Sequence, residues 1–224
     1  DRYASRGLGD VYKRQGDVKL NLDKMMKNKD KAVSILTKGV EFLFKKNKVT
    51  YLKGFGSFIS EKKISIKGED GKIKEIEAKN IIIATGSEAM PMPNVEFDEK
   101  SIVSSTGALS LKEVTKSLVV VGGGYIGLEM GSVWSRLGAE VNVIEFLDHI
   151  TPGMDREISE EFMKILKKQN IKFHLNRKVT SIKKTNSGVQ ITTSDKNGDN
   201  KDFNCNVALI SIGRKPFTLS LIHI

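Results

Sequence analysis

The feature that most constrains the fold is a glycine-rich turn between a predicted strand and a predicted helix. Residues 117–121 form the continuous apolar run Ser-Leu-Val-Val-Val, which is typical of a buried parallel strand. The run Gly-Gly-Gly-Tyr-Ile-Gly follows at 122–127, and apolar residues then recur at helical spacing up to Gly138. A strand, a glycine turn and a helix in this order predict an α/β protein with a parallel sheet.

The glycines of this turn have the G-x-G-x-x-G spacing of a dinucleotide-binding site. Gly122 permits the tight turn, Gly124 lets a pyrophosphate approach the backbone, and Gly127 lets the helix pack closely on the strand. The helix N-terminus supplies N–H donors and a favourable dipole for the anion. A glycine turn that serves only close packing is the alternative.

Two carboxylates near this turn are candidate site residues. Glu145 ends the next predicted strand, 141–145, where an acidic side chain hydrogen-bonds the ribose hydroxyls of an adenosine. The same charge repels a 2′-phosphate, so the sequence favours NAD over NADP. Glu129 is the second candidate, but a carboxylate in the first turns of a helix also stabilises the helix dipole, and both roles stay open.

Further elements follow from periodicity. After the strand at 141–145, Asp155 is a predicted N-cap for a second helix, and short strands are expected at 179–183, 189–193, around Phe203 and from Val207 to the turn at Gly213. Before the glycine turn, residues 18–47 predict one long amphipathic helix. Its apolar face is expected to pack inside a larger domain, and a membrane surface or a docking partner is the alternative.

The segment after this helix alternates around Gly and Asp, so residues 57–60, 63–67 and 72–77 predict antiparallel hairpins. Residues 80–86 predict an apolar strand that runs into Thr-Gly. Residues 88–116, which include Pro91 and Pro93, predict a linker.

The two ends differ from the rest of the chain. Residues 1–15 follow neither a helical nor a strand period, and both they and residues 219–224 resemble translated sequencing-adapter or cloning sequence. Short native termini are the alternative. We therefore expect residues 16–218 to be an internal fragment of a longer protein, flanked by foreign or disordered tails.

Composition excludes several classes of site. The single Cys205 excludes an internal disulfide, a four-thiolate metal centre and a two-cysteine redox centre within this chain. No apolar run reaches the length of about 18 residues that a membrane span needs. The net charge of +10 arises mostly from lysines interleaved with acidic residues, which favours solvated faces over a nucleic-acid surface. We expect no metal, no membrane and no nucleic-acid partner.

Six segments of the chain are distinctive. They are Val-Lys-Leu-Asn-Leu-Asp-Lys-Met-Met at 18–26, Ile-Ala-Thr-Gly-Ser at 83–87, Ser-Thr-Gly-Ala-Leu at 105–109, Gly-Gly-Gly-Tyr-Ile-Gly-Leu-Glu at 122–129, Gly-Ser-Val-Trp-Ser-Arg-Leu-Gly-Ala-Glu-Val at 131–141 and Ile-Gly-Arg-Lys-Pro-Phe at 212–217. Together they resemble the dihydrolipoamide dehydrogenase branch of the flavin-dependent pyridine nucleotide-disulfide oxidoreductase family. The Ala-Thr-Gly and the nucleotide fingerprint are shared by the whole family, whereas the stretch at 131–141 points to this branch.

The resemblance implies a Rossmann-like NAD-binding domain, 117–218, inserted into a partial FAD-binding domain, 16–87, with 88–116 as the linker. It implies FAD contacts at Gly56, Thr85, Gly86 and Ser87. The NAD contacts that follow from the fingerprint and the resemblance are Gly122, Gly123, Gly124, Tyr125, Ile126, Gly127, Leu128, Glu145, Val179 and Gly213, with Glu129 beside the nicotinamide.

The resemblance also implies an activity for the parent enzyme, the reoxidation of dihydrolipoyl groups with electrons passing through a disulfide and FAD to NAD+. Such a parent is a homodimer and a component of 2-oxo acid dehydrogenase or glycine cleavage complexes, in the mitochondrial matrix of a eukaryote or the cytoplasm of a bacterium. A glutathione or mercuric reductase type and a non-catalytic NAD-binding module are the alternatives.

The family's first FAD fingerprint, its Cys-x4-Cys pair and its His-Glu acid–base pair have no match in this sequence. Cys205 does not stand in for a redox cysteine, and none of His149, His174 and His223 has a glutamate at the family's spacing. We therefore expect no catalytic residue in this chain, an inactive fragment, and NAD(H) binding at most.

Overall fold

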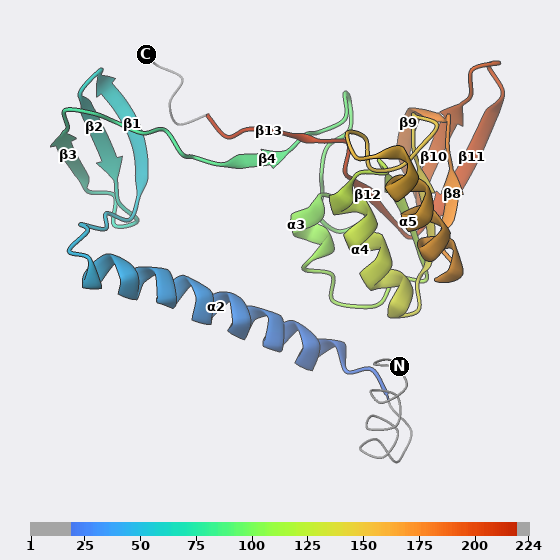
Figure 1. Cartoon of the computed structure of the whole chain (residues 1–224), viewed down its shortest axis with the longest axis horizontal. Coiled ribbons are helices and arrows are strands. Elements are labelled where there is room, and N and C mark those ends of the chain that lie inside the picture. Colours follow the sequence, from blue (N-terminus) through green and yellow to red (C-terminus); the bar gives the residue numbers. More distant parts are fainter. Residues whose placement is uncertain (1–18, 219–224) are drawn as a thin grey trace.

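The computed structural model describes residues 19–218 of the 224-residue chain. The segments at 1–15 and 219–224, expected to be foreign, lie outside the described residues. Figure 1 shows two regions connected by a two-stranded ribbon, and a long helix that leads into the smaller region. One region is a small antiparallel sheet, and the other is a layered α/β unit that contains the glycine turn.

The long helix α2, Leu22–Lys46, confirms the helix predicted from the apolar spacing. Its N-cap is Asn21, whose side-chain oxygen accepts a hydrogen bond from the N–H of Lys24 at 2.9 Å. None of its residues is buried. Only its first turns touch the α/β unit, where Leu22 and Met26 pack against the core. Between these first turns and Phe44, which is half-buried beside Tyr51, the apolar side chains Val33, Ile35, Leu36, Val40, Phe42 and Leu43 are exposed.

The three-stranded sheet confirms the predicted hairpins. Its strands β1 (Phe55–Ser60), β2 (Lys63–Lys67) and β3 (Ile73–Glu77) pair antiparallel in sequence order. The strand predicted at 80–86 is wrong, because residues 81–86 have no regular structure and Ile82 is 90% exposed. An apolar strand needs a neighbour that accepts its hydrogen bonds, and within residues 19–218 no strand pairs with this segment.

The ribbon between the two regions is built by segments that are far apart in the sequence. Strand β4 (Ser87–Ala89) pairs antiparallel with β13 (Arg214–Pro216). The N–H of Met90 also donates to the carbonyl of Gly213 at 3.0 Å, which continues the pairing toward the α/β unit.

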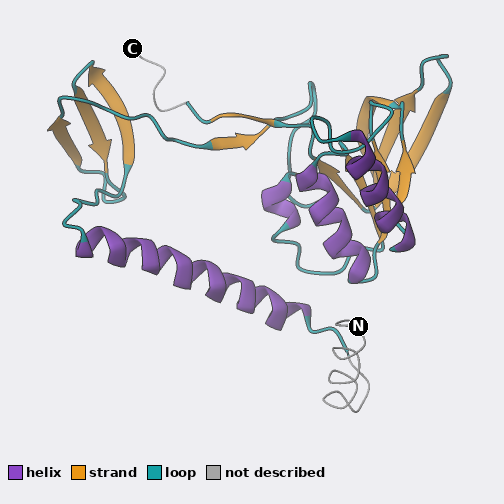
Figure 2. Ribbon diagram, in the orientation of Figure 1, coloured by secondary structure: helices purple, strands orange, loops and turns teal. Residues whose placement is uncertain are grey.

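The α/β unit confirms the predicted parallel sheet. It has the strand order β5-β12-β6-β7-β8, and each neighbouring pair is parallel. The strands are β5 (Ile102–Val103), β6 (Ser117–Val121), β7 (Glu140–Ile144), β8 (Lys172–His174) and β12 (Val207–Ile210). The helices are α3 (Ser105–Ala108), α4 (Tyr125–Arg136) and α5 (Arg156–Lys168), which Figure 2 shows grouped beside this sheet.

The sheet is covered on both faces, which explains why β6 is apolar throughout. Leu118 and Val120 of β6 belong to a core with Leu128 and Trp134 of α4. Val119 and Val121 point to the opposite core, which is closed by an antiparallel sheet of β9 (Lys178–Thr185), β10 (Gly188–Ser194) and β11 (Asn200–Cys205). A strand buried on both faces carries no polar alternation.

The predicted linker at 88–116 needs a correction. Residues 102–108 belong to the α/β unit, since Ile102 and Val103 form the edge strand β5 beside β12 and Ala108 is buried in the core. The physical reason is a parallel pairing with residues about one hundred positions later, which gives no local signal. No helix of the described residues 19–218 is long and apolar enough to cross a membrane.

Candidate functional site

The glycine turn has the geometry that its spacing predicts. Gly122 has a φ of 106°, and a Cβ there would lie 2.5 Å from the carbonyl oxygen of Ser211. A Cβ on Gly127 would lie 2.6 Å from the carbonyl oxygen of Gly122, so only glycine lets α4 pack this closely. At Gly124 the result is opposite, because nothing lies within 4 Å of an added Cβ. Two glycines serve packing, and the third leaves open space.

The open space lies at the N-terminus of α4. Gly124 is the N-cap of this helix and has no side chain to cap it. The first N–H groups of a helix have no acceptor within the helix, and the helix dipole is positive at this end. No capping side chain accepts hydrogen bonds from these N–H groups. They are therefore suited to bind an anion.

Glu145 is held directly against this turn. Its side chain is buried, and its Oε2 accepts a hydrogen bond from the N–H of Gly123 at 2.5 Å. Its Oε1 accepts from the N–H of Leu147 at 2.8 Å. Two hydrogen bonds from backbone N–H groups fix the carboxylate at the end of β7, beside the glycine turn.

The turn and Glu145 line one cavity of about 1130 Å³. The cavity lies at the carboxyl ends of β6, β7 and β12, where parallel α/β sheets bind ligands. Seven of the residues predicted for NAD line it, namely Gly122, Gly124, Tyr125, Ile126, Glu145, Val179 and Gly213.

Four residues predicted for NAD do not line this cavity. Gly123 contributes through its backbone contact with Glu145, and Gly127 and Leu128 are buried in the packing of α4. Glu129 is exposed on α4. The structure therefore separates Glu129 from the cavity that holds the other predicted residues.

Several other residues that line the cavity carry no recognisable sequence signal. One group of them belongs to the loop after β7 and includes Phe146, Thr151 and Met154. Arg177 also lines the cavity, and its guanidinium donates to the carboxylate of Asp199 at 3.1 Å. The only available signal was position, because loops that follow the carboxyl ends of parallel strands form the binding crevice.

The residues predicted for FAD are not gathered in this cavity. Thr85 and Gly86 are exposed, and Gly86 has a φ of 76° that favours glycine. Ser87 lies on β4, where its Oγ accepts from Nε of Arg214 at 2.7 Å. Gly56 lies in β1, and a Cβ there would make an ordinary contact of 3.7 Å with Ile64.

Other reactive groups lie outside the cavity. Cys205 is buried in the core beside β10, and burial raises the pKa of its thiol to about 11, so it stays protonated. Within residues 19–218 no cluster of His, Cys, Asp and Glu has the arrangement of a metal site. Cys205 is not among the residues that line the cavity.

The chain belongs to the pyridine nucleotide-disulphide oxidoreductase family, whose family model matches residues 5–222. It is 55% identical over 208 residues to the dihydrolipoamide dehydrogenase of Chaetomium thermophilum, which covers 92% of this chain and 41% of that protein. It is 51% identical over 206 residues to the mitochondrial dihydrolipoyl dehydrogenase of Pisum sativum, with 92% and 41% covered. This confirms the resemblance inferred from the sequence motifs.

Solved structures show the same relationship. An HOCl-induced flavoprotein disulfide reductase of Escherichia coli, RclA, has a TM-score of 0.73 and 27% identity, over 89% of this chain and 44% of that one. LpdA of Mycobacterium tuberculosis shares the fold, with a TM-score of 0.81 and 24% identity over 96% of this chain and 48% of that one. The dihydrolipoyl dehydrogenases and their family use FAD and NAD. This chain spans about two fifths of the length of its curated relatives.

Proposed function

We propose that this chain carries the NAD-binding part of a dihydrolipoyl dehydrogenase. The observation that supports this most directly is the meeting of the glycine turn, the open N-terminus of α4 and the Glu145 carboxylate in one cavity. The backbone donors suit the pyrophosphate, and the carboxylate suits the ribose hydroxyls of the adenosine half.

In this proposal the protein residues bind and orient the dinucleotide. Val179 of β9 and Gly213, in the turn between β12 and β13, line the cavity and are proposed to contact the dinucleotide. Glu129 is proposed to lie beside the nicotinamide. Bound NAD+ supplies the acceptor of the electrons. The open space at Gly124 fits this group, because the close approach of a pyrophosphate needs a residue without a side chain.

We further propose that residues 16–87 are part of an FAD-binding domain into which residues 117–218 are inserted, together with residues 102–108 of the same α/β unit. Gly56, Thr85, Gly86 and Ser87 are the proposed FAD contacts. The β4–β13 ribbon supports this arrangement, because it pairs the segment that follows residues 16–87 with the segment that follows the last strand of the α/β unit.

The activity proposed for the whole protein is the reoxidation of dihydrolipoyl groups, with electrons passing through a disulfide and FAD to NAD+. Its proposed setting is a homodimer within a 2-oxo acid dehydrogenase or glycine cleavage complex, in the mitochondrial matrix of a eukaryote or the cytoplasm of a bacterium. Several relatives are named mitochondrial, which supports the eukaryotic alternative. The 224-residue chain itself is proposed to be inactive, since its single cysteine cannot form the disulfide.

A binding measurement tests the proposal. Isothermal titration of the 224-residue chain should show NADH binding more tightly than NADPH. Glu145→Arg should reverse or abolish this preference, because it replaces the ribose acceptor by a partner for a 2′-phosphate. Glu140→Arg, at the other end of β7, is the matched control and should leave the ratio unchanged. An unchanged ratio in Glu145→Arg would contradict the assignment.

A second measurement concerns the reaction. The purified 224-residue chain should show no lipoamide-dependent reduction of NAD+ and no flavin-dependent turnover, whereas a longer protein containing this sequence and a cysteine pair should show both. Turnover by the 224-residue chain alone would refute its proposed inactivity. Binding of NADH without lipoamide turnover by the longer protein would favour the non-catalytic module.

A further inference from the structure

The loop over the cavity contains a backbone conformation that its sequence does not explain. Thr151 has a φ of 51°, in the left-handed region that β-branched residues rarely adopt. Pro152 follows it, and a residue before proline normally prefers an extended conformation. Such an outlier persists only where surrounding contacts hold it, and these positions cluster at functional sites.

Three contacts hold Thr151 in place. Its N–H donates to the carbonyl oxygen of Gly123 at 2.8 Å, which joins the loop to the glycine turn. Its Oγ1 shares a hydrogen bond of 2.7 Å with Oγ of Ser159, a residue of α5 that is only 1% exposed. Its carbonyl accepts from the N–H of Met154 at 3.1 Å. Thr151 therefore links the glycine turn to α5 through hydrogen bonds.

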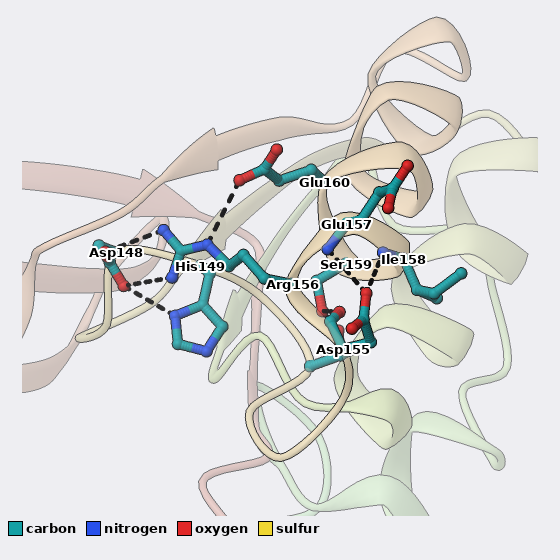
Figure 3. A network of polar contacts seen from close by, with 9 residues as sticks. Asp148, His149, Asp155, Arg156, Glu157, Ile158, Ser159 and Glu160 are labelled. Carbon is teal, nitrogen blue, oxygen red and sulfur yellow. Dashed lines mark hydrogen bonds and ion pairs between the residues drawn. The ribbon is translucent and has the colours of Figure 1, made fainter.

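Ser159, the partner of Thr151 on α5, is itself held in place. Oγ of Ser159 lies 2.9 Å from the carbonyl oxygen of Asp155, and the carboxylate of Asp155 caps α5 by accepting from the N–H groups of Glu157 and Ile158 (Figure 3). The start of the loop is tied to the same helix by Arg156, which donates to both carboxylate oxygens of Asp148 at 3.2 and 2.9 Å.

These contacts fix the backbone of Gly123, because its N–H and its carbonyl are each hydrogen-bonded to a different element. Glu145 accepts from its N–H, and Thr151 donates to its carbonyl. Because a peptide unit is planar and trans, fixing the carbonyl of Gly123 also fixes the direction of the following N–H, that of Gly124. Gly124 lines the cavity at the N-terminus of α4.

We propose that Thr151 and Ser159 are positioning residues of the dinucleotide site. Their shared hydrogen bond keeps Thr151 in its left-handed conformation, and Thr151 in turn orients the peptide that presents the Gly124 N–H to the pyrophosphate. This inference rests on the proposed NAD site and adds two residues that lie outside the G-x-G-x-x-G sequence pattern.

The test uses the 224-residue chain with NADH as the probe. Thr151→Val and Ser159→Ala each remove one hydroxyl, and each should weaken NADH binding by about fivefold, the effect of losing roughly one hydrogen bond. Thr151→Ser keeps the hydroxyl and should stay within about twofold of the parent chain. Ser135→Ala removes a comparable bond to Gln169 at the other end of α5 and should also stay within that limit.

A double variant and a spectrum separate positioning from general stability. Since Thr151 and Ser159 share one bond, the double variant should bind no more weakly than either single variant. The amide resonances of Gly123 and Gly124 should move in both single variants and stay in place in Ser135→Ala. Additive losses, or unchanged glycine resonances, would overturn the assignment.

The possible failures are distinguishable. If the parent chain does not bind NADH, the proposed function fails and this assignment fails with it. If the parent chain binds NADH and the Thr151 and Ser159 variants bind equally well, only the positioning role is overturned.

Discussion

Helix α2 and the small β1-β2-β3 sheet differ from the α/β unit in how far their apolar side chains are buried. Every buried hydrophobic side chain of the described residues lies between Ile102 and Ile210. In α2 the large apolar side chains Ile35, Leu36 and Phe42 are all more than half exposed. One region forms a core from its own sequence, whereas the other presents a face without one.

An amphipathic sequence pattern therefore predicts that a helix forms, but it does not predict that the apolar face of the helix is packed against a core. The spacing of α2 predicted a helix correctly, and the helix forms with a proper N-cap and lysines in its last turn. Most helical stability in proteins nevertheless comes from packing of the apolar face. An exposed face of this kind marks an interaction surface or an aggregation hazard.

Hydrogen exchange should show the largest contrast between the regions. Amides in the second half of α2, residues 33–46, should exchange at least about a thousandfold faster than those of β6, because local opening there disrupts no core. Mass spectrometry of peptic fragments of the 224-residue chain measures both segments in one sample. Equal protection would show that α2 is covered in solution and would break the comparison.

Truncation of one leucine in each region should give the next largest effect. Leu118→Ala in β6 removes a side chain with no exposed surface and should lower the free energy of unfolding by about 2–5 kcal/mol. Leu36→Ala on α2, where the side chain is 71% exposed, should change it by less than about 0.5 kcal/mol.

Urea unfolding followed through the single tryptophan measures these changes, since Trp134 is buried in the core of the α/β unit. A large loss in Leu36→Ala would mean that the α2 face is packed and would reverse the interpretation of that region.

The same contrast explains which parts of the fold the sequence could predict. The strand, turn and helix around Gly122 were predicted correctly because every signal is local and the partners lie within the α/β unit. The strand expected at 80–86 was wrong because its apolar run depends on a neighbouring strand that residues 19–218 do not provide. Edge strand β5 was missed because its partner, β12, is distant in the sequence.

The candidate site shows a similar division. The glycine spacing led to Gly122, Gly124 and Glu145, which the structure brings into one cavity. The left-handed φ of Thr151 could not be predicted from the sequence, because this conformation is typical of Gly, Asn and Asp and not of Thr. Its role follows from contacts with Gly123 and Ser159 that only the folded chain brings together.

The N-caps of α5 and α2 allow the stability of the two regions to be compared at single residues. Asp155 caps α5 in the packed unit, and Asn21 caps α2. Asp155→Ala should lower the tryptophan-detected free energy of unfolding by about 1 kcal/mol, because two N–H groups lose their acceptor. Asn21→Ala should lower the helical circular dichroism signal without changing that free energy. An equal loss in both variants would show that α2 and the α/β unit unfold together.

Acidification should give the smallest effect, confined to the α/β unit. Desolvation lowers the pKa of His174 below 6.5, and the charges of Lys201, Arg177 and Lys172 lower it further. A depressed pKa means that the unfolded chain binds the proton first, so the folded state loses stability as the pH falls from about 6.5 through the folded pKa. Above that window both states are neutral and no effect is expected.

Tryptophan-detected urea unfolding at pH 7.5 and at pH 5.5 measures this loss. His174→Gln, which keeps a polar group toward Asn142, should remove the part of the pH dependence that belongs to His174. Because neither α2 nor the small sheet contributes a histidine to the described residues, their helical and strand signals should not follow this titration. A pH dependence that survives in His174→Gln would assign the loss to groups other than His174. One that appears equally in the α2 signal would show that the two regions unfold together.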